Sequence, residues 1–104
     1  MSTVVVTAVF HAAEGRRDDL AAALRDALPD VHAEDGCELY ALHSADDGTL
    51  VLIEKWTSRE ALAAHAAGEP VARLNAAIAP HLAAPAIVTT MDAIPAGDAG
   101  RGTL

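Results

Sequence analysis

The chain has 104 residues and a formal net charge of −8, from 15 acidic and 7 basic side chains. A chain of this length forms one small domain. A negative field of this size disfavours phosphate backbones and anionic membrane surfaces, so we expect neither nucleic acid nor membrane as a partner. Although 52 % of the residues are apolar, only 3 % are aromatic, and much of the apolar content is alanine. The core must therefore be small.

Cysteine content and leader patterns indicate the compartment. The single cysteine, Cys37, cannot close an intrachain disulfide. No apolar run approaches the roughly 20 residues of a membrane span, and the amino terminus lacks the pattern of a signal peptide. We therefore expect a cytoplasmic protein.

The first 32 residues predict a strand and a helix. Residues 3–10 are rich in β-branched side chains and contain no breaker, which favours a strand. After Gly15, leucines recur at helical spacing up to Leu28, which indicates an amphipathic helix. Pro29 lacks an amide hydrogen, so we expect the helix to stop or kink near Leu28.

Two further strands are predicted around an Asp-Gly turn. Residues 37–44 and 50–57 are apolar runs, and Asp46-Asp47-Gly48 lies between them. Such a turn between two strands predicts a hairpin.

A pair of helices follows the hairpin. Thr57 or Ser58 can cap a short helix that ends at Gly68, and Glu60 stands three residues after Thr57, as in a capping box. Pro70 suits the first turn of the second helix. We expect prolines near residue 80 to close it.

The carboxyl-terminal part predicts one more strand and a tail. Residues 86–94 have the composition of a strand, whereas residues 95–104 are rich in small residues and glycine. We therefore expect one domain over residues 1–94 and a flexible tail over residues 95–104.

The order strand, helix, strand, strand, helix pair, strand is typical of an α+β fold. It predicts a ferredoxin-like split βαβ arrangement with a four-stranded antiparallel sheet and helices on one face. Alternation places Leu50 and Leu52 on one face and Val51 and Ile53 on the other, so both faces are apolar. Helices cover only one face. We therefore expect a homodimer in which the second faces pack together.

The histidines do not form a metal-binding pattern. No His-x-His, His-x₃-His or Cys-x₂-Cys pair occurs, so we expect no metal site. We expect the first and third strands to run parallel, which would place His11 and His43 near opposite ends of the sheet. His32 and His81 are expected at the surface or at helix ends.

Several short motifs occur in a fixed order along the chain. Gly15 opens a helix, and the later motifs are Gly36-Cys37-x-x-Tyr40 and Glu54-x-Trp56-x-Ser58-x-x-Ala61-Leu62-x-x-His65. The set, from Val4 to about Ile94, resembles the antibiotic biosynthesis monooxygenase family. The resemblance implies a dimeric αβ barrel with one pocket per subunit between sheet and helices. It also implies oxidation of quinols, anthrones or related polyphenols by O₂ with no metal, flavin or haem, so no cofactor is expected.

His65 and Trp56 are the candidate catalytic residues. His65 lies near the apolar face of the predicted short helix, where an imidazole can accept a phenolic proton or stabilise an oxyanion. It can equally satisfy the backbone at the helix end near Gly68. If the resemblance holds, the Trp56 indole forms a flat wall for a planar substrate. Alternatively, Trp56 is simply the largest side chain that packs in a small core.

Four further residues are candidate substrate-binding groups. Glu54 shares a strand face with Trp56, and a buried carboxylate there needs a partner such as Arg73 or a backbone amide. Tyr40 can donate its hydroxyl to a substrate carbonyl or pack at the sheet edge. The others are Phe10, in the pocket or the core beneath it, and Asn75, on the inner face of the last helix.

These features favour a cofactor-independent monooxygenase that acts on a small planar hydroquinone, anthrone or phenolic polyketide. An isomerase of phosphorylated sugars is one alternative, although it needs clustered cations and only Arg59 and Arg73 lie near the relevant helices. A non-catalytic binding module is another. Haem degradation is disfavoured, because Ala8 stands where that branch is understood to have an asparagine.

Overall fold

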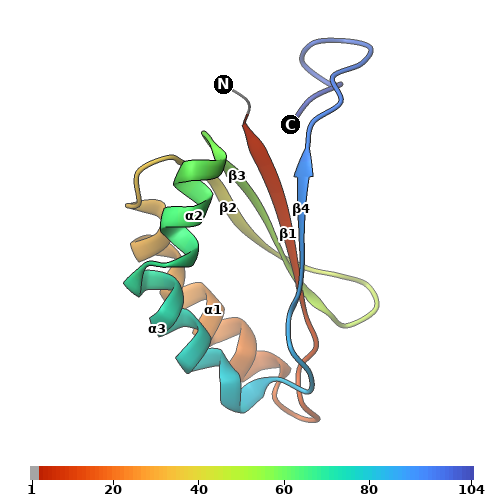
Figure 1. The fold of residues 1–104 in the computed structure, drawn as a ribbon. Helices are drawn as coiled ribbons and strands as arrows, with labels where there is room; N and C mark the ends of the chain where they lie inside the picture. Colours follow the sequence, from red (N-terminus) through yellow and green to blue (C-terminus); the bar gives the residue numbers. More distant parts are fainter. Residues whose placement is uncertain (1–2) are drawn as a thin grey trace.

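The computed structural model describes residues 3–104, so the first two residues of the expected domain lie outside it. The elements are β1 (Val4–Phe10), α1 (Arg17–His32), β2 (Cys37–Ser44), β3 (Leu50–Trp56), α2 (Arg59–Ala66), α3 (Glu69–Ile78), a 3₁₀ turn η1 (Ala79–His81) and β4 (Ile87–Asp92). The strands form one antiparallel sheet in the order β2-β3-β1-β4. The helices cover one of its faces (Figure 1). The predicted ferredoxin-like α+β fold is confirmed.

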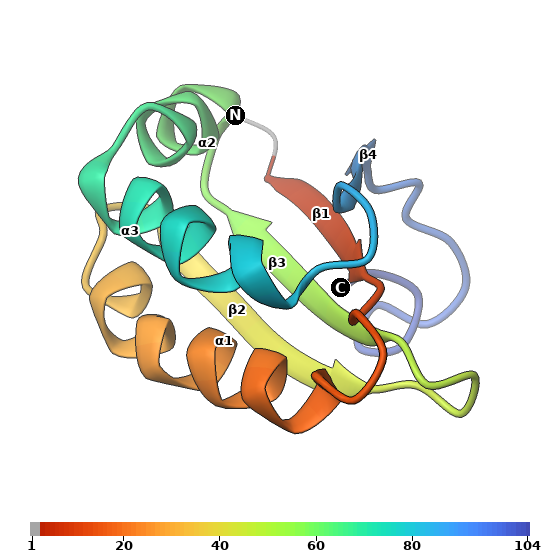
Figure 2. The same ribbon diagram turned by 90° about the horizontal axis from the view of Figure 1, so that it is seen from below.

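Burial alternates residue by residue along β1 and β3. Leu50 and Leu52 are buried beneath the helices, whereas Val51 and Ile53 are half-buried on the opposite face. Figure 2 shows the helical layer on one side of the sheet and none on the other. The predicted division of each strand into two apolar faces is therefore confirmed for the central strands.

The direction of the strands corrects one expectation. Val51 on β3 lies opposite both Val9 on β1 and His43 on β2, and both pairings are antiparallel. The expectation that the first and third strands run parallel is therefore wrong. In a split βαβ unit the parallel strands are β1 and β2, because β3 inserts between them in the opposite direction. His11, directly after β1, and His43, near the end of β2, thus lie toward the same end of the sheet. Residues 3–104 contain no cluster of three His, Cys, Asp or Glu side chains suited to a metal ion.

Helix α1 continues past Pro29 to His32, so of the stop or kink expected near Leu28 the stop is wrong. Proline removes the hydrogen bond to the carbonyl four residues earlier, which belongs to Arg25. Both Pro29 and Arg25 are exposed, so water can reach this carbonyl, and the buried Val31 keeps the last turn packed.

No helix in the described part of the chain has the length and apolar character needed to cross a bilayer.

Helices α2 and α3 begin close to their predicted starts. The Ser58 Oγ accepts the amide hydrogen of Ala61 at 3.0 Å, so Ser58 is the cap of α2. The capping box counted from Thr57 to Glu60 is wrong, because the cap lies one residue later. Pro70 lies in the first turn of α3, as expected.

Residues 95–104 follow β4 and contain a local turn. The Asp98 Oδ1 accepts the amide hydrogen of Gly100 at 2.9 Å, and the Asp98 carbonyl accepts that of Gly102 at 2.7 Å. These bonds are all within the tail. Flexibility of the tail stays a prediction.

Candidate functional site

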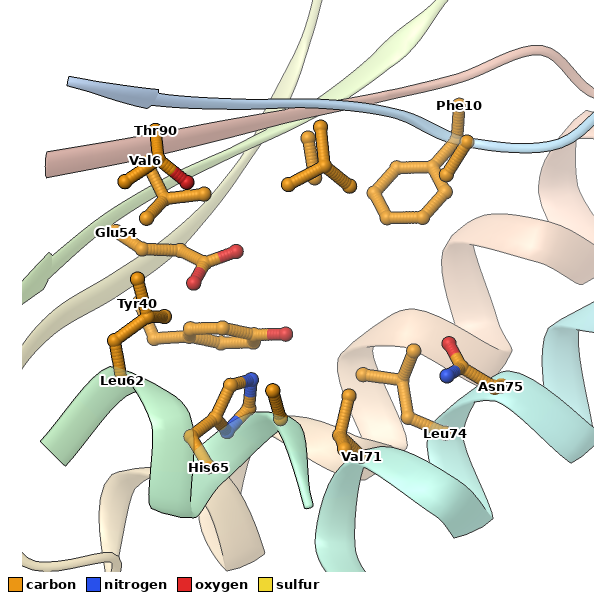
Figure 3. A pocket seen from close by; sticks show the side chains of 14 residues that line it. Val6, Phe10, Tyr40, Glu54, Leu62, His65, Val71, Leu74, Asn75 and Thr90 are labelled. Atoms are coloured by element: carbon orange, nitrogen blue, oxygen red, sulfur yellow. The ribbon is translucent and has the colours of Figure 1, made fainter. Parts of the chain in front are cut away.

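A cavity of about 330 Å³ lies between the covered face of the sheet and helices α2 and α3 (Figure 3). Most of its lining residues are apolar and come from β1, α2, α3 and β4 with the segment just before it. Its lining side chains that can form hydrogen bonds are Tyr40, Glu54, His65, Asn75 and Thr90. A small apolar cavity with a few converging polar groups is typical of a site for a small organic ligand.

Five of the six candidate residues meet at this cavity, although they come from five different elements. The lining includes Phe10 from β1, Tyr40 from β2, Glu54 from β3, His65 from α2 and Asn75 from α3. All are buried except Asn75, which is exposed and stands at the rim. The structure therefore brings five of the candidate residues together, four in the cavity wall and one at its rim.

Trp56 is fully buried and lies behind the cavity wall. Its Nε1 donates a hydrogen bond to the Glu54 Oε1 at 3.0 Å. The indole thus does not form the flat cavity wall that the sequence suggested. The expected Arg73 partner of Glu54 is also wrong, because Arg73 is exposed and pairs with Asp30 and Glu69.

The environment of Glu54 favours its protonated form. Burial raises the pKa of this carboxyl, and the Trp56 hydrogen bond and the charge of His65 only partly oppose that effect. Figure 3 shows the carboxyl directed into the cavity. Glu54 can therefore exchange hydrogen bonds and a proton with a bound ligand.

Tyr40 is held in its neutral form. Burial raises the pKa of its hydroxyl, and the charges of Glu54 and Glu34 raise it further. Its ring packs edge-on against the His65 ring, with 5.6 Å between centroids, and Figure 3 shows its hydroxyl pointing into the cavity. Tyr40 is therefore available as a hydrogen-bond donor to a ligand oxygen.

His65 forms an ion pair or hydrogen bond with a residue that the sequence reasoning missed. Its Nδ1 lies 2.8 Å from the Glu34 Oε2, and both side chains are largely buried. The His65 ring also packs against Trp56, with centroids 4.5 Å apart. The alternative was that the His65 side chain bonds to the backbone at the helix end near Gly68. It bonds to Glu34 instead. Glu34 gave no local signal, since 31 residues separate it from His65.

A tight turn brings Glu34 to the site. Gly36 has φ +84°, and a Cβ at this position would lie 2.6 Å from the Ala61 Cβ and 2.8 Å from the Thr57 Oγ1. The Gly36 carbonyl also accepts the amide hydrogen of Thr57 at 2.9 Å. The loop between α1 and β2 therefore lies directly on the start of α2, which places Glu34 beside His65.

Among the described residues, no lysine or arginine lines the cavity. Arg59 pairs with Asp92 on the surface at 3.0 Å, and Arg73 is also paired there. With neither Lys nor Arg in the wall, the cavity offers little to balance the charge of a strongly anionic ligand.

A family model described as antibiotic biosynthesis monooxygenase matches residues 3–77. A protein of Mycobacterium tuberculosis with the name "Putative monooxygenase Rv0793" is 37 % identical over 91 residues, which span 86 % of this chain and 90 % of that protein.

Solved structures give the same picture. The structure of Rv0793 superposes with a TM-score of 0.82 and 34 % identity over 94 % of this chain and 99 % of the other. PA3566 from Pseudomonas aeruginosa gives a TM-score of 0.80 and 25 % identity over 90 % and 96 % of the two chains. A Caulobacter crescentus structure titled as a putative antibiotic biosynthesis monooxygenase has a TM-score of 0.82 at 22 % identity, over 89 % and 91 %, and supports the fold alone.

Proposed function

Because the chain belongs to the antibiotic biosynthesis monooxygenase family, we propose that it oxidises a small planar hydroquinone, anthrone or phenolic polyketide with O₂. The observation that carries this proposal is the cavity, in which Tyr40, Glu54 and His65 converge within apolar walls. In the proposed reaction the substrate supplies the electrons, and no cofactor is required. The protein binds the ring, removes a proton and excludes water.

The proposed reaction starts with proton transfer from a phenolic or enolic oxygen to His65. The substrate anion then passes one electron to O₂, and the two radicals combine to a peroxide anion at a ring carbon, which takes the proton back from His65. Loss of water from the peroxide leaves a carbonyl group at that carbon. One oxygen atom enters the product and the other leaves as water, so an anthrone CH₂ becomes a C=O group.

The candidate residues have different roles in the proposed reaction. Phe10 and the apolar walls hold the ring, whereas Tyr40 donates a hydrogen bond to a substrate oxygen. Glu54 binds a substrate hydroxyl, and Asn75 orients the substrate from the rim. Trp56 acts from behind the wall, since it contacts His65 and donates to Glu54.

The same cavity weighs against a phosphorylated-sugar isomerase. A phosphate group needs cationic side chains or a cluster of backbone amides, and within residues 3–104 the cavity lining contains neither lysine nor arginine. A non-catalytic binding module stays an alternative of a different kind, because it would bind aromatic ligands without depending on His65 for turnover.

We further propose that the uncovered sheet face binds a second copy of the chain. This face carries Val51 and Ile53 from β3, and Ile87 and Met91 from the edge strand β4 are 56 % and 36 % exposed. An antiparallel sheet with one solvated face normally presents polar residues there. The same apolar face of a second copy would cover these side chains.

The test is oxygen uptake with a panel of hydroquinones and anthrones, measured before and after chelation of metals. With ¹⁸O₂, mass spectrometry should find one labelled oxygen in the product. We expect His65→Ala to lower kcat by roughly 10²- to 10⁴-fold with an unchanged circular dichroism spectrum. The matched control is His11→Ala, since His11 is exposed and lies outside the cavity. Equal turnover of His65→Ala and the parent would refute the role of His65, and binding without oxygen uptake would favour the binding module.

A further inference from the structure

We propose that Glu34 is a positioning residue that holds His65 in the tautomer with its proton on Nδ1, so that an unprotonated Nε2 faces the cavity. The proposal rests on the proposed function of the cavity and extends it to a residue outside the lining. It follows from three features of the site: the contact at Nδ1, the surroundings of Nε2 and the packing of the ring.

The contact at Nδ1 defines where the proton lies. The Glu34 Oε2 is 2.8 Å from Nδ1, and a carboxylate accepts hydrogen bonds but donates none. A neutral imidazole has one N–H group, so Nδ1 must be the donor. The proton on Nδ1 leaves Nε2 with a lone pair, which is the state that a general base requires.

Nε2 is open to the cavity. Nδ1 is the only ring nitrogen of His65 that bonds to another group within residues 3–104. Within the same residues, no side-chain nitrogen or oxygen that is sealed from solvent lacks a partner. Nε2 must therefore be accessible, and His65 lines the cavity. Figure 3 shows one ring nitrogen on the side of Tyr40.

Two contacts fix the orientation of the ring. The Trp56 indole packs against it at 4.5 Å with an interplanar angle of 32°, and the Glu34 carboxylate holds one edge. The side chains of His65 and Glu34 are only 6 % and 16 % exposed, so water competes weakly for the bond. A single rotamer and a single tautomer are thus selected together.

The other titratable groups around His65 do not take this role. Tyr40 faces it from β2 and Glu54 from β3, and neither forms a hydrogen bond to the imidazole. Cys37 lies near both glutamates, and burial raises the pKa of its thiol. Glu34 is therefore the group that determines the His65 tautomer.

The experiment records two-bond ¹H–¹⁵N correlation spectra of ¹⁵N-histidine-labelled protein near pH 8, above the ordinary histidine pKa of about 6.5. We expect the Nδ1–H form of His65 in the parent. In Glu34→Gln we expect a mixture, because an amide can accept from Nδ1 or donate to it. The matched control, Asp35→Asn, removes the same charge from the exposed neighbouring residue and should leave the parent spectrum.

The turnover of Glu34→Gln tests whether Glu34 positions His65 for the reaction or only makes a structural contact. With any quinol that the protein oxidises, Glu34→Gln should lower kcat by about 10- to 100-fold, as for other partners that orient a functional histidine. KM should change little, because Glu34 does not line the cavity. An unchanged kcat in Glu34→Gln would overturn the proposal.

The spectra and the turnover measurements together distinguish a failure of the Glu34 proposal from a failure of the proposed function. An Nε2–H or doubly protonated His65 in the parent overturns the inference whether or not any quinol turns over, and that result does not depend on Glu34→Gln being able to fold. An Nδ1–H parent spectrum with no turnover of the panel supports the tautomer and counts against the proposed oxidation.

Discussion

At the scale of single residues, the buried carboxyl of Glu54 links the site to stability. It is 5 % exposed and its partner is the Trp56 indole, not a cation. Since burial raises its pKa in the folded chain, the folded state binds more protons than the unfolded state between the two pKa values. The free energy of unfolding therefore falls as pH rises through that window. Glu54 destabilises the fold at neutral pH and not in acid.

We therefore expect Glu54→Gln to raise Tm at about pH 7, because glutamine keeps an acceptor for Trp56 and carries no charge. The gain should shrink as pH falls toward the ordinary glutamate pKa of about 4.3. Thermal denaturation over a pH series measures both effects. The control is Glu38→Gln, whose carboxylate pairs with Lys55 at 3.6 Å near the surface and should give no such gain. A lower Tm for Glu54→Gln at neutral pH would contradict the assignment.

The strand pattern placed Glu54 on the same face as Trp56, but it did not identify the residue that Glu54 contacts. The Trp56 indole reaches it from the same strand face, two residues along. Arg73 was the wrong partner because the buried face of α3 is formed by Leu74 and Ile78, which turns Arg73 to solvent. Side-chain partners depend on helix rotation, and periodicity fixes that only approximately.

At the scale of elements, the turn at Gly36 determines how the loop after α1 meets α2. We expect Gly36→Ala to destabilise the fold by roughly 2–4 kcal/mol, because alanine would be strained at φ +84° and its Cβ would overlap Ala61. Urea unfolding measures the change. Since this turn carries Glu34, kcat should also fall if the proposed base is correct.

Gly15 is the matched control for this prediction. It also has a positive φ, +75°, but nothing lies within 4 Å of a Cβ placed there. Gly15→Ala should therefore cost only the backbone strain, roughly 1 kcal/mol. Equal losses for Gly15→Ala and Gly36→Ala would show that the contact with α2 is not important.

The sequence predicted the presence of the helices and strands better than it predicted where they end and in which direction the strands run. Alternation and turn chemistry predicted the strands, since each signal is local. The stop expected at Pro29 was wrong because the cost of a proline within a helix depends on whether water reaches the carbonyl that loses its hydrogen bond. That exposure is a property of the folded surface and cannot be read from the local sequence. The pairing of Glu34 with His65 was beyond prediction, because it requires the loop at Gly36 and helix α2 to meet in space.

At the scale of the whole molecule, a single chain is less compact than its length predicts. Its radius of gyration is 14.2 Å, whereas about 13 Å is expected for a domain of this size. Its accessible surface is 6183 Å², whereas a compact monomer of this mass exposes about 5,500 Å². The exposed β4 strand, the uncovered sheet face and the largely exposed tail over residues 95–104 contribute to this excess. A second copy on the uncovered face would cover the first two.

We therefore expect the parent to be a dimer at micromolar concentration and Ile53→Glu to be a monomer. Ile53 lies on the central strand β3 within the uncovered face, where a glutamate would be buried against the partner without a counter-charge. The control, Ala22→Glu, adds the same charge at an exposed position of α1 and should remain a dimer. Light scattering coupled to size exclusion gives both masses. A monomeric parent would refute the dimer, and a dimeric Ile53→Glu would move the interface away from this face. If the monomer keeps its circular dichroism spectrum and loses turnover, the cavity depends on the partner for its shape. If it keeps both, each subunit forms a complete site.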